Sequence, residues 1–125
     1  MKFAQLTSLL LFLFFFGNIL EAQELNLAVY DSIMGSDASD QEKVKKIEAL
    51  LEKDQEVIPS DLATVYYRFS KWFWTEKKND KKAIFYAKKE RLLRAENLDL
   101  KVDDRKRNMY NLGFFYRKSS NPDYT

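Results

Sequence analysis

A segment near the end of this chain repeats the pattern of a segment 43 residues earlier, and this echo constrains the fold more than any other feature. The later segment is Met109–Tyr116 and the earlier one is Tyr66–Phe73. Large residues align with large ones and a small residue with a small one: Tyr66 with Met109, Phe69 with Leu112, Ser70 with Gly113, and Phe73 with Tyr116. Self-similarity at a spacing of about 20–50 residues is typical of solenoids built from stacked repeats. The echo therefore predicts a repetitive binding scaffold rather than an enzyme.

The composition favours helices and excludes several kinds of chemistry. Only three glycines and two prolines occur among the 125 residues, whereas strand-and-turn folds need more of both at their corners. The chain has no cysteine and no histidine, which excludes disulfides, Cys/His zinc sites, cysteine nucleophiles and histidine bases within it. The carboxylates are not spaced as an acid–base pair or as a calcium-binding loop. We therefore expect no enzyme activity, no catalytic residue, no metal site and no cofactor.

Residues 1–23 have the pattern of a secretory signal peptide. Met1-Lys2 supplies a positive charge, and Phe3–Phe16 is apolar and uncharged. This apolar run is shorter than the roughly 20 residues that span a bilayer. We expect cleavage near Ala22 or Gln23, an exported product that is periplasmic or secreted, and no stable membrane span after cleavage. The alternative is that the segment is retained as an anchor.

Residues 24–59 are predicted to form an N-terminal amphipathic helical segment. Ser39 followed by Glu42 fits a capping box. A helix is expected over Asp40–Glu56, because apolar residues at spacings of three and four form one stripe along it: Val44, Ile47, Leu50 and Leu51. The residues before this helix are mixed, with apolar positions that allow a short helix ahead of a Gly-containing loop.

Three more amphipathic helices are expected in the rest of the chain: Leu62–Lys77, Lys81–Glu96 and Asp104–Lys118. Pro59 ends the preceding helix, and Ser60 or Asp61 can cap the next one. Short connections between amphipathic helices make neighbours antiparallel. The predicted fold is all-α, with antiparallel helical hairpins that stack because none can bury its apolar face alone.

The two echoing segments resemble helix A of tetratricopeptide repeats (TPR). Family members carry a bulky residue, a Leu-Gly-like pair three positions on, and an aromatic residue three positions later. Met109, Leu112-Gly113 and Tyr116 match this pattern. Helix B of the family opens with an alanine in close helix contact, and Ala83 resembles that position. The resemblance implies a short TPR-like α-solenoid over residues 60–125, with its second repeat incomplete.

The chain departs from the family in two respects. Its period is longer than the roughly 34 residues of the family, as in extended repeats, and Glu90 and Arg91 stand where helix B has apolar residues. The pattern also ends in a turn before a second helix B. We therefore expect a fragment, the N-terminal part of a longer exported bacterial protein, that self-associates through the open end of the solenoid.

The TPR resemblance implies a protein–protein interaction scaffold that binds through the concave face of its helix A elements. Carried over by position, the partner-binding residues are Tyr67, Lys71, Trp74, Arg107, Tyr110, Phe114 and Arg117. Aromatic and arginine side chains are frequent anchors at interfaces, and cations suit the acidic groups of a peptide or protein partner. The alternative is that several of these aromatics pack against neighbouring helices.

Two other functions stay open at this point. One is the non-catalytic N-terminal region of a longer enzyme, a sensor kinase or a caspase-like protease, whose catalytic domain is absent. The other is a small secreted helical bundle without a binding groove.

The helix expected over Lys81–Glu96 is basic. Such a helix can hold phosphate groups or contact an anionic membrane or cell-wall polymer. Its charges fall on several faces, which indicates a solvated surface and no nucleic-acid partner.

Overall fold

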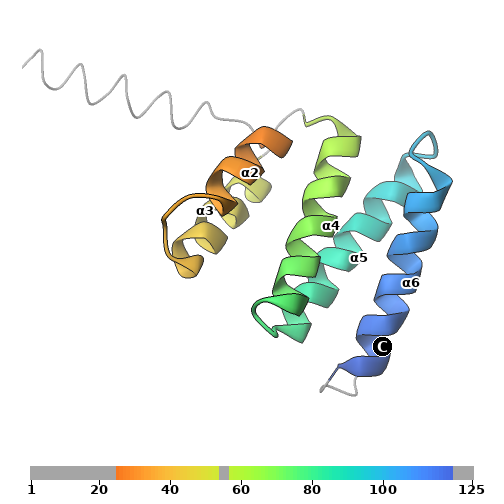
Figure 1. The fold of residues 1–125 in the computed structure, drawn as a ribbon. Helices are drawn as coiled ribbons and strands as arrows, with labels where there is room; N and C mark the ends of the chain where they lie inside the picture. The colour runs from red at the N-terminus through yellow and green to blue at the C-terminus, as the bar shows by residue number, and fades with distance from the viewer. Residues whose placement is uncertain (1–24, 54–56, 120–125) are drawn as a thin grey trace, which may run out of the picture.

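The chain folds into two layers of helices. The computed structural model describes residues 25–53 and 57–119, and these form five α-helices and no strand: α2 (Leu27–Met34), α3 (Asp40–Glu52), α4 (Pro59–Thr75), α5 (Asp80–Glu96) and α6 (Val102–Lys118). Figure 1 shows α2, α4 and α6 side by side in one layer, with α3 and α5 behind them. This arrangement confirms the predicted all-α stack of antiparallel hairpins. The predicted signal peptide, and all but the first residue of the turn predicted over residues 119–123, lie outside the described residues.

Three helices begin at a side-chain cap. The side-chain oxygens of Asn26, Ser39 and Asn79 each accept a hydrogen bond from the backbone N–H three residues on, at 2.9, 3.2 and 3.1 Å. Such a cap satisfies one of the N–H groups that the first turn of a helix leaves without a partner. The predicted start of α3 after Ser39 is confirmed. α3 is observed as far as Glu52, and residues 54–56 lie outside the described part.

The helices α4 and α6 begin earlier than predicted and without a side-chain cap. Pro59 is the first residue of α4, so neither Ser60 nor Asp61 caps it. Proline suits this position, because it lacks an N–H that would have no helical partner and its φ angle is already helical. α6 begins at Val102, and Asp103 in its first turn places a carboxylate at the positive end of the helix.

The N-terminal segment forms a hairpin of two helices, α2 and α3. α2 packs on both α3 and α4, which makes the hairpin the first unit of the stack. Tyr30 of α2 and Ile47 of α3 are buried by this packing. The short helix that the sequence allowed ahead of the Gly-containing loop is therefore present, and it supplies a third helix to the front layer.

The core is aromatic and centres on Phe69 of α4, which is fully buried. Its ring centroid lies 4.7 Å from those of Phe73 and Tyr86, and 6.2 Å from that of Tyr30. Aromatic pairs in tilted and edge-on arrangements add to the stabilisation from buried apolar surface. Phe69 thus joins α2, α4 and α5 in one cluster, and truncating it to alanine is expected to cost about 3–5 kcal/mol.

The echo that organises the sequence has a physical basis at its small residue. Ser70 of α4 is buried, and its hydroxyl donates a 2.6 Å hydrogen bond to the carbonyl oxygen of Ala83 on α5. Ala83 is itself fully buried, as expected for the alanine at a close helix crossing. Small side chains on both helices let the backbones approach closely. Gly113, the counterpart of Ser70 on α6, is half-buried.

Candidate functional site

Four of the seven predicted partner-binding residues pack between α4 and α6. The guanidinium carbon of Arg107 lies 3.8 Å from the ring centroid of Tyr67. Trp74 meets Phe114 edge-on at a centroid distance of 5.9 Å, and it stacks on Phe115 at 4.5 Å with an interplanar angle of 24°. These contacts join the two front-layer helices, and the four predicted residues are half-buried.

The other three predicted residues are exposed. Tyr110 of α6 has 68% of its surface exposed, and Arg117 lies two turns further along the same helix. Lys71 stands on α4, on the side toward α2 rather than the side toward α6. The structure therefore joins Tyr67 with Arg107 and places Lys71 at the recess between α2 and α4.

Lys71 lines a recess of about 350 Å³ between α2 and α4. The residues around it are Tyr30, Met34, Arg68, Lys71, Trp72, Thr75 and Glu76. In its wall, Arg68 forms an ion pair with Asp31 at an N–O distance of 2.8 Å. Trp72 stacks on Phe69 with 6.1 Å between the ring centroids. The recess is open to solvent rather than enclosed, and it combines aromatic surface with a few polar groups.

Sequence reasoning missed most of this recess. It depends on α2, whose eight residues give little periodic signal. Tyr30 and Met34, which are four residues apart and so share one face of α2, were the available clue. Without the position of α2, nothing in the sequence indicated which side of α4 they would meet.

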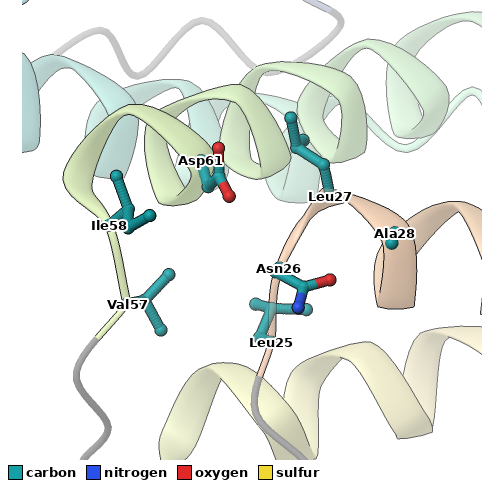
Figure 2. Close-up of a pocket in the computed structure, with 7 residues that line it drawn as sticks. All are labelled: Leu25, Asn26, Leu27, Ala28, Val57, Ile58 and Asp61. Carbon is teal, nitrogen blue, oxygen red and sulfur yellow. The ribbon is translucent and has the colours of Figure 1, made fainter.

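A second recess of about 330 Å³ lies where α2 and α4 begin. Figure 2 shows Val57 and Ile58, which lead into α4, across from Leu25 and Asn26. Asp61 is the only charged residue in the described lining. We assign this recess no role.

A buried charged network connects α5 with α6. Glu90 is 1% exposed and accepts hydrogen bonds from Arg94 Nε at 2.7 Å and from Asn108 Nδ2 at 2.9 Å. Asn108 Nδ2 also lies 3.0 Å from the carbonyl oxygen of Ala87, to which it donates. Burial raises the pKa of Glu90, whereas Arg94, Asn108 and Arg107 oppose that shift.

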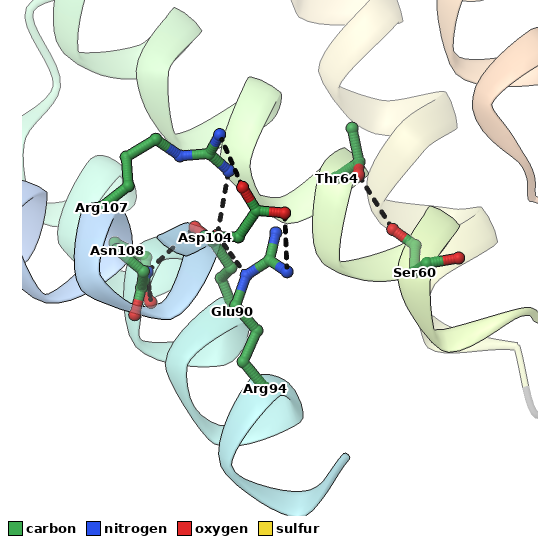
Figure 3. A network of polar contacts seen from close by, with 8 residues as sticks. Ser60, Thr64, Glu90, Arg94, Asp104, Arg107 and Asn108 are labelled. Atoms are coloured by element: carbon green, nitrogen blue, oxygen red, sulfur yellow. Dashed lines mark hydrogen bonds and ion pairs between the residues drawn. The ribbon is translucent and has the colours of Figure 1, made fainter. Parts of the chain in front are cut away.

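Asp104 completes this network at the protein surface. Figure 3 shows the guanidinium groups of Arg94 and Arg107 converging on Glu90 and Asp104. Arg107 lies 3.4 Å from Asp104 and 3.8 Å from Glu90, and Arg94 lies 3.9 Å from Asp104. Each carboxylate is engaged by arginine, so the arrangement suits helix docking rather than proton transfer. From the sequence, the one sign of this network was that Glu90 stands where the resembled repeats have an apolar residue on helix B.

Searches for other functional features and for relatives gave no match. Among the described residues, no three Asp or Glu side chains are grouped so as to hold a metal ion. None of the described helices is both long and apolar enough to cross a bilayer. No protein-family model, no curated protein and no solved structure matches the chain.

Proposed function

We propose that this chain is an exported helical-repeat scaffold of the tetratricopeptide type, which binds a peptide or protein segment along the layer of α2, α4 and α6. The recess between α2 and α4 is the observation that carries the proposal. It places aromatic surface and cations together on the layer that the TPR resemblance implies for binding. Helical repeats often present such layers to extended partners.

The recess suits a segment with one apolar side chain beside an acidic or carbonyl acceptor. Tyr30, Met34 and Trp72 offer apolar surface. Arg68 is already paired with Asp31, whereas Lys71 makes no ion pair with any residue in the described ranges. Lys71 is therefore the cation available to an incoming carboxylate or carbonyl group, and tryptophan is a frequent anchor at protein interfaces.

The test is selection of binders from a phage-displayed peptide library on the purified chain, followed by affinity measurement by calorimetry. The variant Thr75→Arg should fill the recess and weaken the selected peptides at least tenfold. Lys71→Glu should weaken the acidic ones. Lys45→Glu on α3 is the matched control, because it makes the same charge change on an exposed residue of the other layer.

A second pair of variants tests how far the binding surface extends. Tyr110→Ala and Arg117→Ala on α6 should weaken long peptides without lowering helicity, because both side chains are exposed. If no peptide is selected, or if every selected peptide binds Thr75→Arg as tightly as the original chain, the proposal fails.

The export part of the proposal rests on Met1-Lys2 and the apolar run of Phe3–Phe16. Mass spectrometry of the chain recovered outside the cytoplasm of an expressing bacterium should show loss of about the first 22 or 23 residues. Recovery of only the uncleaved chain with the cell membranes would support the retained anchor instead.

A further inference from the structure

One face of α5 is exposed, with α3 beside its Phe85 and Lys89 and α6 beside its Lys88. Its residues follow spacings of three and four, which places them on one side of a helix: Lys81, Phe85, Lys88, Lys89, Leu92 and Glu96, all of them exposed. We call this set the α5 outer face. The opposite side of α5 buries Ala83, Tyr86, Ala87, Glu90 and Arg94 against α4 and α6. The α5 outer face thus belongs to the back layer and is separate from the recess between α2 and α4.

The α5 outer face carries two large apolar side chains that no described residue covers fully. Phe85 is 52% exposed and Leu92 is 59% exposed. They are seven residues apart, so they lie on one side of the helix about 10 Å apart along its axis. The other back-layer helix, α3, has no large hydrophobic residue that is exposed to this degree. Within the described back layer, exposed large apolar side chains therefore occur on α5 and not on α3.

The same face is basic. Lys81, Lys88 and Lys89 share it with Glu96, at the C-terminal end of the helix, and Glu48 and Glu52 of α3 border it beside Phe85 and Lys89. Lys89 Nζ lies over the Phe85 ring, 5.4 Å from its centroid, so the charge and the apolar ring are presented side by side. Such side chains can extend to phosphate groups while neighbouring apolar side chains insert more deeply.

We propose that the α5 outer face docks on an anionic phospholipid bilayer, with Phe85 and Leu92 at the boundary between head groups and acyl chains. Lysines near an anionic membrane each contribute favourable electrostatic energy. Apolar side chains that project from a basic helix add burial in the interface, which distinguishes lipid from a soluble polyanion.

The surroundings of the face argue against an acidic peptide as its occupant. A hollow of about 290 Å³ opens beside Phe85, lined by Glu48, Lys81, Lys82, Phe85 and Tyr86. It does not extend to Leu92, and the carboxylate of Glu48 lies in its wall, 2.6 Å from Lys82. A peptide in this hollow would leave Leu92 exposed and would meet Glu48, whereas a flat bilayer contacts both apolar side chains.

The chain has no cysteine, so a single introduced cysteine can carry an environment-sensitive fluorophore. Leu92→Cys reports on the α5 outer face, and Ala49→Cys reports on an exposed site of α3 in the same chain. With phosphatidylcholine vesicles containing phosphatidylglycerol, the Leu92→Cys label should brighten and shift to shorter wavelength. The Ala49→Cys label should not, although both chains carry the same N-terminal apolar run.

Charge variants supply the matched control. Lys88→Gln with Lys89→Gln should lower the partition coefficient roughly 25-fold, because each lysine contributes about a factor of five. Lys45→Gln with Lys46→Gln removes the same charge from an adjacent exposed pair on α3 and should have little effect. Circular dichroism of each variant checks that the fold is kept, as expected for exposed positions.

Three results would overturn the proposal. One is a Leu92→Cys label that does not respond to phosphatidylglycerol vesicles. Another is equal loss of binding in the two lysine pairs, which would show that overall charge is responsible. The third is an equal fluorescence response to inorganic polyphosphate, which would identify a soluble polyanion as the ligand. None of these results bears on peptide binding at the other layer, so the two proposals fail independently.

Discussion

The guanidinium group of Arg107 lies over the ring of Tyr67, with 3.8 Å between its carbon and the ring centroid. The two residues are forty positions apart and come from helices α6 and α4. The same guanidinium also reaches Asp104 and Glu90. One side chain therefore connects the front-layer helices with the buried charge on α5, so its replacement should affect stability as well as binding.

We expect Arg107 and Tyr67 to be energetically coupled. In a double-mutant cycle of Arg107→Ala and Tyr67→Leu, the two effects on the free energy of unfolding should differ from additivity by about 1 kcal/mol, the range of a partly buried cation–π pair. Urea unfolding followed by tryptophan fluorescence measures each corner of the cycle. Additive effects would mean that the observed stacking contributes nothing to stability.

Replacing Glu90 alone should lower the free energy of unfolding far more than replacing Glu90 and Arg94 together. Glu90→Leu leaves a buried arginine without its closest partner and should lower the free energy of unfolding by about 3–5 kcal/mol. Glu90→Leu with Arg94→Met replaces the pair by apolar residues and should recover most of that loss. Thermal unfolding of the three chains gives the comparison. A double variant as unstable as Glu90→Leu would show that Asn108 and Asp104 need the charged pair.

A larger side chain should lower the stability of the fold at Ser70 and raise it at the aligned position, Gly113. Ser70→Leu loses the hydrogen bond to Ala83 and overpacks a buried crossing, at a cost of about 3 kcal/mol. Gly113→Ala should gain about 0.5–1 kcal/mol from helix propensity. Its new Cβ would lie 3.3 Å from Arg117 Nη1, the movable end of a flexible side chain. Denaturation midpoints test both changes, and destabilisation by Gly113→Ala would indicate a neighbour at that face.

The protein should lose stability in alkali as its buried tyrosines ionise. Burial raises the pKa of Tyr30 from 10.0 to about 12. Burial likewise raises the pKa of Tyr66 and, together with the carboxylate of Glu48, that of Tyr86. A pKa that is higher in the folded state contributes stability that is complete below pH 10 and is lost as the pH rises toward 12. Tyrosinate absorbance and helicity followed on the same samples should change together, and early ionisation without unfolding would contradict this account.

Local patterns in the sequence predicted local features of the fold. The cap at Ser39 and the close contact at Ala83 depend on residues within one turn or on one helix face, and both are confirmed. The predicted start of α4 was wrong. The helix begins at Pro59, so Ser60 and Asp61 lie inside it and do not cap it.

The relationships that sequence reasoning missed join residues far apart in the chain. The hydrogen bond from Asn108 to Glu90 spans 18 positions between two helices, and no spacing rule links them. The recess beside Lys71 depends on how α2 packs against α4. The predicted site residues were therefore assigned to the correct helices, but their neighbours could be identified only from the packed structure.

The hydrogen bonds to α5 determine where this stack can flex. Ser70 of α4 and Asn108 of α6 donate to the carbonyl oxygens of Ala83 and Ala87, one turn apart on α5. A slip of either neighbour by one residue would turn its donor away by about 100°, so α4, α5 and α6 should move as a rigid block. The ion pairs that join the α2–α3 hairpin to this block are solvent-exposed or only part-buried, and salt weakens such pairs. Bending of the solenoid should therefore concentrate at that seam, where a change in ionic strength would alter its curvature and the width of the recess beside Lys71.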